Sequence, residues 1–485
     1  MKKDISVNNK IIGILGAFFF ISPNLNILES VLSYCKIESH DTVRLISIGI
    51  FCALDLVIAI MFFISKPRKE LITSLVVFNA VYILPVVINR NMTEIMQYMM
   101  FVLPVTIFAV MLAADDEIKK SFFRYLFYAS RILMAIAIIY IAMQYLSDNR
   151  DENGVVIIRN MTYGDMGYLF LTGFIVSLIE ICEKRSFIAY AGIVLFSLAI
   201  FFSGTRSAML CVIFSVLLFA VFSIFGASKR RRAAVIIIAA AAVIIVVSMF
   251  AIPAGSRLNF IHFDITSSDF SIKDLIFETK ADETFDRDVI YSPTGEQRKI
   301  SEIYEEEIVK NDCLKSVTED MLHEDVSSGR CEYVTLITED DRPFAENYRP
   351  FRHRTFLWRT AVQEFRKHPV FGNGPCYYKT KYDGFFPHNI LLEVMADFGI
   401  VGLVIVIALG VYCFVIAFKN SIKDGNEYYF YLSLLLFSHL PRYLLYTTIY
   451  SNTTIAMTIL VFLVPELLKK LSESNKSLKT GRRDE

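Results

Sequence analysis

The sequence predicts an all-α, polytopic membrane protein of about 12 transmembrane helices, with one large extracytoplasmic loop between spans 9 and 10. Of its 485 residues, 54% are hydrophobic and 20% are charged. The apolar residues fall in blocks of about 18 to 25, long enough for a helix to cross about 30 Å of hydrocarbon. A soluble chain of this length would carry more charge on its surface.

The spans follow from hydropathy, taken in chain order. They are 11–32, 45–64, 71–88, 96–114, 122–146, 163–182, 187–203, 207–226, 233–252, 398–418, 428–447 and 453–468. Pro23, Asn24 and Asn26 interrupt the first span, so we expect a kink there. The chain then divides into spans 1–9 (1–252), the loop (253–387), spans 10–12 (388–470) and a tail (471–485).

Loops rich in lysine and arginine alternate along the chain with loops that are poor in them, and this alternation orients the spans. Basic clusters at 2–3, 66–69, 119–120, 184–185 and 229–232 all fall on one predicted side, together with the tail. Cytoplasmic loops carry this excess. The sequence therefore predicts a multi-pass protein of the cytoplasmic membrane with both termini in the cytoplasm and 253–387 outside.

The predicted outer loop is electrically divided. Residues 253–341 hold 22 Asp and Glu against 9 Lys and Arg, whereas 342–387 hold 9 Lys and Arg against 3 Asp and Glu. The stretch 265–341 is typical of a solvated acidic insertion. The basic part, 342–387, would attract an anionic ligand and is where we expect the chemistry.

The first motif is FFSGTRSAML at 201–210. Ser203 and Gly204 allow a tight turn, after which Arg206 begins a helix at the outer membrane face. Arginine beside helix-terminal N–H groups suits a phosphate. An arginine that merely reaches the interface from a helix end is an equally good interpretation.

The second motif is RTFLWRTAVQEFRKHPVFGNGP at 354–375. Its apolar spacing predicts an amphipathic helix over 354–367, opened by Arg354 and ended by His368-Pro369. Gly372 and Gly374 predict a tight turn behind it. The alternative is a re-entrant cap in which Trp358 is an interfacial anchor and the arginines face solvent.

The third motif is FFPHNILLEVMADFGIVGL at 385–403. His388 and Asn389 begin a short helix at the junction of loop and membrane. An imidazole is able to take a proton from a hydroxyl at neutral pH, although a lone histidine is more often structural. Asn389 is suited to orienting substrate or to capping the helix. Asp397 is expected to pair or line the cleft, and Gly399 and Gly402 to allow close packing.

Together the motifs resemble the O-antigen ligase and surface-polysaccharide polymerase superfamily over roughly 190–420. The matching positions are Arg206 with Leu210, Arg354 with Trp358, Pro369 with Gly372 and Gly374, and His388-Asn389 with Gly399 and Gly402. The resemblance implies a glycosyltransferase that moves a glycan from a polyprenyl-diphosphate carrier to an acceptor hydroxyl. The acidic insertion looks longer than the family's loop.

The resemblance also implies roles for individual residues. Arg206 and Arg354 would bind the diphosphate, and His388 would be the general base of a metal-independent, inverting transfer. Arg442, beside His439 and Pro441, is an additional candidate for the same site, together with Asn389 and Asp397. Asp165 at the outer mouth is expected to be structural.

The expected partners are the lipid bilayer, the lipid-linked glycan donor, and a glycan, lipid or wall-polymer acceptor. No nucleic acid, metal or cofactor is expected, and the 8 cysteines form no CxxC pair. A polymerase and a ligase would use the same residues. The competing class is a flippase for lipid-linked sugars or another transporter, although the sequence shows no paired halves.

Overall fold

The computed structural model describes most of the chain outside the predicted loop. The described residues are 6–21, 26–34, 40–88, 92–146, 158, 161, 163–184, 186–225, 289–291, 297–299, 354–381, 386–422, 427–445, 447–450 and 452–481. They are almost entirely helical. Within them the only strands form the antiparallel hairpin of β1 (Val289–Tyr291) and β2 (Gln297–Lys299).

The helices fall into three groups along the chain. The N-terminal group is α1 (Val7–Ile21), α2 (Asn26–Tyr34), α3 (His40–Ile64), α4 (Lys69–Ile88), α5 (Met92–Gln97), the π-turn η1 (Tyr98–Val102), α6 (Leu103–Ala114) and α7 (Asp116–Leu146). The next group is α8 (Tyr163–Lys184), α9 (Phe187–Phe202) and α10 (Arg206–Phe225). The C-terminal group is α17 (Arg354–Lys367), α18 (Tyr377–Lys381), α19 (Ile390–Ile422), α20 (Glu427–Phe437), α21 (Leu440–Leu445) and α22 (Thr453–Gly481).

Seven stretches of the described chain are helical, long and apolar enough to cross a membrane. They correspond to α3, α4, α5–α6, α7, α8, α10 and α19. Large apolar side chains remain exposed on them, including Phe63 (67%) and Val404 (57%), which suits contact with lipid. The multi-pass helical class is therefore confirmed. The predicted span 233–252 and the acidic insertion, apart from the hairpin, lie outside the described residues, so the count of twelve stays a prediction.

Two predicted spans differ in detail from single straight helices. The span predicted at 398–418 belongs to α19, which runs from Ile390 to Ile422 and is kinked at Gly399. The span predicted at 428–447 is divided into α20 and α21 at Ser438 and His439. Pro441 explains this break, because proline lacks an N–H and its ring clashes with the carbonyl four residues earlier.

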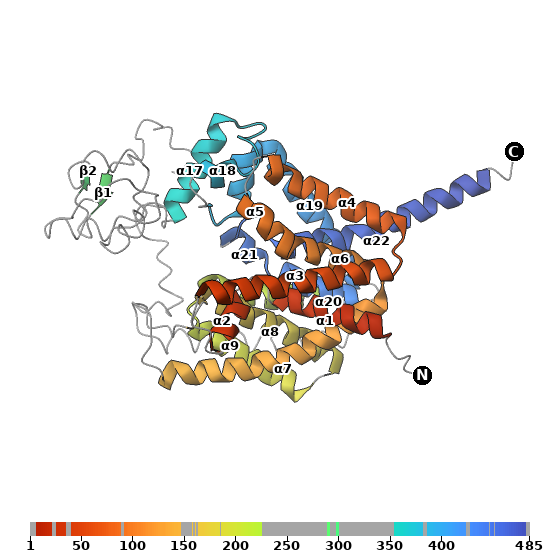
Figure 1. Ribbon diagram of the computed structural model, residues 1–485, viewed down its shortest axis with the longest axis horizontal. Helices are drawn as coiled ribbons and strands as arrows, with labels where there is room; N and C mark the ends of the chain where they lie inside the picture. The colour runs from red at the N-terminus through yellow and green to blue at the C-terminus, as the bar shows by residue number, and fades with distance from the viewer. Residues whose placement is uncertain are drawn as a thin grey trace.

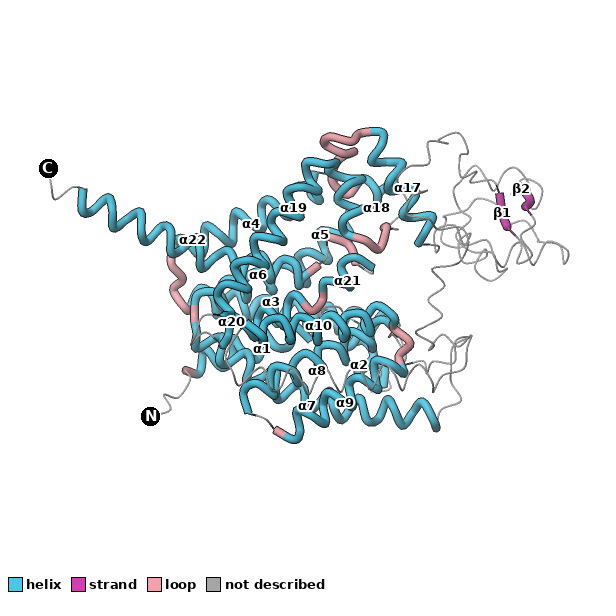
Figure 2. Tube along the Cα trace, turned by 180° about the vertical axis from the view of Figure 1, so that it is seen from behind, coloured by secondary structure: helices cyan, strands magenta, loops and turns pink. Residues whose placement is uncertain are grey.

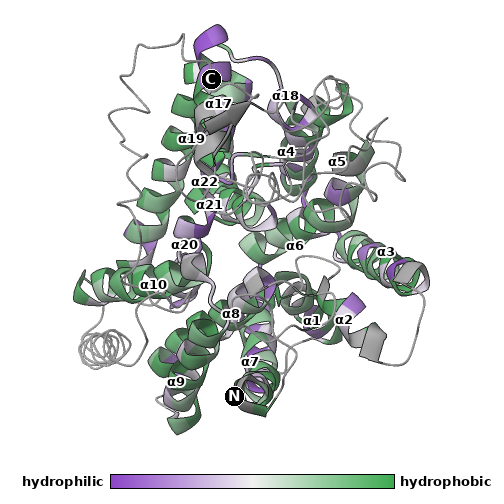
Figure 3. Cartoon of the chain, turned by 90° about the vertical axis from the view of Figure 1, so that its left-hand side faces the viewer, coloured by the Kyte–Doolittle hydropathy of each residue, from purple (hydrophilic) through white to green (hydrophobic). Residues whose placement is uncertain are grey.

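The helices pack side by side in a bundle (Figures 1 and 2). α8 and α9 pack on α7, while α6 packs on α22 and α17 packs on α19. Hydrophobic residues cover much of α3, α9 and α10 in the view along the bundle (Figure 3). The beginning of α1 and the end of α22 lie at one end of the molecule, and α17 and α18 lie toward the other (Figure 1).

Candidate functional site

The turn after α17 is joined to α19 by an exchange of backbone hydrogen bonds. In an unbroken helix the amides of Ile400 and Val401 would donate to carbonyls four residues earlier. Here Ile400 donates to the Pro369 carbonyl over 2.8 Å and Val401 to Val370 over 3.2 Å. The released carbonyl of Asp397 accepts from the Gly374 amide over 2.9 Å. The turn and the kink therefore form one unit.

Two glycines make this close approach possible. Gly399 has φ 65° and ψ −160°, a conformation that only glycine adopts readily. A Cβ on Gly399 would lie 2.4 Å from the Val370 oxygen, and one on Gly372 (φ 72°) would lie 2.3 Å from the Asp397 backbone. The predicted tight turn is confirmed. The close neighbour of Gly399 is the turn after α17 and not another span.

Asp397 is buried beneath this unit, where it accepts hydrogen bonds from two sides. The Tyr378 amide donates to one carboxylate oxygen over 2.9 Å and the Tyr450 hydroxyl to the other over 2.5 Å. The Tyr450 hydroxyl also accepts from the Cys376 amide over 2.7 Å. Burial, and next the Asp397 charge, raise the pKa of Tyr450 above its ordinary value, so that its hydroxyl keeps its proton. Asp397 is therefore hydrogen-bonded to its neighbours, and its place in the site stays a prediction.

Glu393 makes a second buried connection, from α19 to the segment before α22. Its carboxylate accepts from the Thr448 hydroxyl over 2.6 Å and from the Ile449 amide over 2.8 Å. The side chain is 0% exposed. A carboxylate without these donors would be very costly to bury, so they fix the position of the start of α19.

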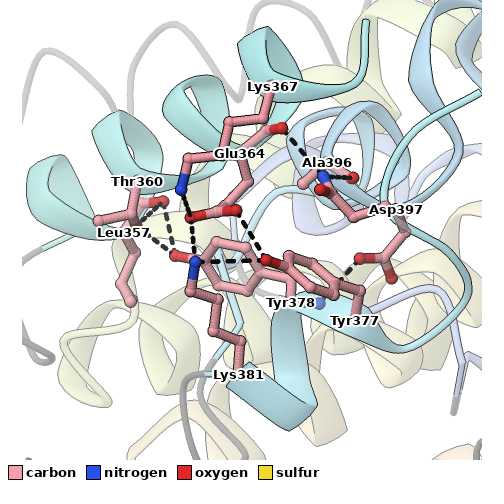
Figure 4. A network of polar contacts seen from close by, with 10 residues as sticks. Leu357, Thr360, Glu364, Lys367, Tyr377, Tyr378, Lys381, Ala396 and Asp397 are labelled. Atoms are coloured by element: carbon pink, nitrogen blue, oxygen red, sulfur yellow. Dashed lines mark hydrogen bonds and ion pairs between the residues drawn. The ribbon is translucent and has the colours of Figure 1, made fainter. Parts of the chain in front are cut away.

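A third polar cluster holds α17 against α18 (Figure 4). Glu364 is 2% exposed and accepts from Lys381 over 2.7 Å, Lys367 over 2.9 Å and Tyr377 over 3.0 Å. Two cations and a hydroxyl compensate for the burial of one carboxylate. The predicted amphipathic helix over 354–367 is confirmed, and one polar residue of its buried face is this glutamate.

His388 stands between Pro387 and the first turn of α19. Its backbone has φ 53°, which is uncommon for a residue other than glycine and is found at functional sites more often than elsewhere. The imidazole is half-buried, and its ring centroid lies 4.3 Å from that of Phe386. The Nζ of Lys379 lies 5.4 Å from the centroid of the same Phe386 ring.

Neighbours on both sides fix the backbone of His388. The indole N–H of Trp358 donates to the Pro387 carbonyl over 2.8 Å. The side-chain oxygen of Asn389 accepts from the amides of Leu391 and Leu392, which caps α19. Trp358 therefore does more than anchor a helix at an interface, and Asn389 has the capping role that the sequence left open.

The two arginines expected to bind diphosphate both occupy helix starts. Arg206 is the first residue of α10, directly after the turn at Gly204, and Arg354 is the first residue of α17. Their side chains lie outside the described part of the chain. The tight turn predicted at Ser203 and Gly204 is confirmed.

Arg442 lies in α21, at the edge of a separate polar pocket. Its guanidinium carbon is 4.1 Å from the centroid of Tyr168, and the Tyr168 hydroxyl donates to Ser207, the residue after Arg206, over 2.7 Å. Asp165 lines the same pocket. His388 does not line it. The two regions adjoin, because Tyr443 packs in one apolar cluster with Ile390.

Several contacts within the site were missed from the sequence alone. Glu393 and Tyr450 lie more than fifty residues from the partners Thr448 and Asp397. The only available signal was the presence of an acid, Glu393, inside an otherwise apolar run. A charged group in such a run needs a partner, but the run does not say which.

One comparison with known proteins finds a family. Residues 191–407, less than half of the chain, match the family model described as O-antigen ligase. No curated protein and no solved structure matches the chain. The matched range contains the turn at Gly204, His388 and the kink of α19 at Gly399, so the resemblance noted in the sequence is confirmed. Over residues 191–407 the chain is similar to the O-antigen ligase family.

Proposed function

We propose that this protein is a membrane glycosyltransferase that moves a glycan from a polyprenyl-diphosphate-linked donor to an acceptor hydroxyl at the outer face of the cytoplasmic membrane. The family match supports the general class. The observation that carries the mechanism is the arrangement of His388, whose strained backbone is held by Trp358 on one side and the Asn389 cap on the other. A general base needs such a fixed position.

In the proposed reaction, His388 takes the proton of the acceptor hydroxyl. The acceptor oxygen forms a bond to the anomeric carbon as the bond from that carbon to the diphosphate oxygen breaks, with inversion. Polyprenyl diphosphate leaves with the bonding electron pair. Arg206 and Arg354 stabilise its charge, each charged hydrogen bond contributing about 1.5–3 kcal/mol.

The experiment is the replacement of His388 by alanine in cells. Surface glycan should be lost and the polyprenyl-linked donor should accumulate, while the amount of inserted protein stays unchanged. His368→Ala is the matched control, since His368 is exposed and contributes its backbone carbonyl to the turn. Normal surface glycan in His388→Ala cells would contradict the mechanism. Donor trapped on the inner face would instead favour a flippase.

Arg206→Ala should also stop transfer, whereas Arg206→Lys should retain part of it, because lysine keeps the charge but not the planar fork. The length of the glycan on the final acceptor in the variant cells distinguishes a polymerase from a ligase. Single repeat units on the final acceptor indicate that a polymerase was lost, and a bare acceptor indicates that a ligase was lost.

The proposed orientation places α17 and α18 outside and both termini in the cytoplasm. The position of α17 and α18 away from the beginning of α1 and the end of α22 supports it (Figure 1). A cysteine at Arg366, in a background without native cysteines, should react with an impermeant reagent from outside, and one at Lys419 should not. The reverse pattern would invert the orientation.

A further inference from the structure

The Arg442 pocket lies where five helices or their ends meet. Its walls come from the end of α1, the start of α2, the start of α8, the segment of α20–α21 at the break, and the start of α22. The polar lining residues are Asp165, Tyr168, Thr172, His439, Arg442 and Thr454. The beginning of α1 and the end of α22 lie at one end of the molecule (Figure 1). The end of α1 and the start of α22, which line the pocket, therefore lie away from that end.

Two polar side chains in this pocket have buried atoms that the protein leaves unpaired. His439 is 3% exposed, and neither of its ring nitrogens has a hydrogen-bond partner. The buried Nε of Arg442 has none either. Buried polar groups are nearly always paired, so each such exception calls for a ligand or a functional explanation. Both of these exceptions line the same cavity.

The positive charge of Arg442 favours an anionic ligand in the pocket. Arg442 is held over the Tyr168 ring at 4.1 Å, an arrangement that leaves the guanidinium edge available for planar recognition of an anion. A neutral histidine adds one ring donor. Asp165 brings a carboxylate but has contacts of its own. The Arg442 Nε and a His439 ring N–H, which line one cavity without acceptors of their own, suit a phosphate group.

An apolar pocket adjoins the polar one. The two share Phe20 and Thr454 in their linings. The remaining lining residues of the second pocket are Gly16, Phe19, Val105, Phe108, Thr453 and Met457. A ligand that fills both pockets therefore has an anionic head and a hydrocarbon continuation, as an isoprenoid phosphate has.

We propose that the Arg442 pocket binds the phosphate or diphosphate head of an isoprenoid lipid, with the first part of its hydrocarbon chain in the pocket of Phe19 and Phe108. This inference rests on the proposed function and deepens it, because it gives Arg442, until now an additional candidate, a defined binding pocket and adds His439 to the carrier-binding groups. Tyr168 connects them to the Arg206 turn through Ser207.

The test measures binding, not transfer, so that it is separate from the proposed reaction. Full-length protein carrying His388→Ala is titrated in lipid nanodiscs with farnesyl diphosphate, inorganic pyrophosphate and farnesol. Farnesyl diphosphate should bind more tightly than either of the others. Arg442→Gln should weaken its binding by about tenfold or more, the loss expected for a charge-assisted hydrogen bond.

The matched control is Arg366→Gln, an exposed arginine in the last turn of α17 outside the pocket, which should leave binding unchanged. Arg442→Lys should fold even if Arg442→Gln does not, and should bind with intermediate strength. Asp165→Asn should bind as tightly as the parent protein or more tightly, because it removes a negative charge from beside the phosphate.

Each contrary outcome points to a different error. Unchanged binding in both Arg442 variants, or weaker binding in Asp165→Asn, would overturn the pocket. Pyrophosphate binding as tightly as farnesyl diphosphate would identify a free phosphate as the ligand and overturn the lipid part. If the His388→Ala protein kept its transfer activity and bound farnesyl diphosphate normally, His388 would not be the base. The proposed ligand of the pocket would still hold.

Discussion

The carboxylates beside His388 and the histidine in the pocket of Arg442 lie in adjoining parts of the bundle, yet their polar atoms are paired differently. Around His388, the carboxylates Glu393 and Asp397 each accept from two donors. In the pocket, the nitrogens of His439 have no partner. A satisfied network fixes one geometry, whereas an unsatisfied one costs stability unless a ligand completes it. We infer that the two carboxylates form a rigid support and that the pocket is a binding site.

The largest effect is expected from crowding the rigid support. Gly372→Ala would place a Cβ 2.3 Å from the Asp397 backbone at φ 72°. The steric clash and the strain of a left-handed alanine should together lower the free energy of unfolding by about 3 kcal/mol or more, and the variant should not transfer glycan. Thermal unfolding in detergent measures the first. Gly410→Ala, where a Cβ meets nothing within 4 Å, is the control; equal stability of the two variants would show that the turn tolerates movement.

The next effect comes from removing one donor. Tyr450→Phe leaves an Asp397 oxygen and the Cys376 amide without their shared partner, and should cost about 1–3 kcal/mol of stability. The same unfolding measurement tests it. Tyr412→Phe, at an exposed tyrosine, should change nothing. If Tyr450→Phe lost no more stability than Tyr412→Phe, the network around Asp397 would not be a structural support.

A smaller stability change with a larger effect on activity is expected at Trp358. Trp358→Phe keeps an aromatic ring but removes the donor to the Pro387 carbonyl, at a cost of about 0.5–1.5 kcal/mol. Transfer should fall by about tenfold or more, since small displacements of a base are expensive. A lower kcat with unchanged KM identifies positioning. Full activity would return Trp358 to the role of an interfacial anchor.

The smallest stability change, of either sign, is expected in the pocket. His439→Phe removes a buried imidazole whose nitrogens have no partner, so the free energy of unfolding should change by less than about 0.5 kcal/mol or rise. Farnesyl diphosphate binding should weaken in the same variant. Destabilisation comparable to that of Tyr450→Phe would remove the distinction between the two regions.

The predictions that succeeded from sequence are those with a local cause. The helix at 354–367, its end at His368, the turn at Gly372 and the junction at Asn389 all follow from residues adjacent in the chain. The sequence did not reveal that Trp358 donates to Pro387, because that contact requires two helices to be packed. The number of spans and the roles of His388, Arg206 and Arg354 remain predictions.

The sequence by itself therefore determined the helical membrane class and the three motifs, because hydropathy and turn chemistry act over short distances. Only the tertiary structure decided which polar groups are satisfied. Asp397 and Glu393 find donors more than fifty residues away, at Tyr450 and Thr448. His439 is brought beside Arg442 and Tyr168 without partners for its nitrogens. Pairing of buried charges depends on distances between elements, which no local pattern encodes.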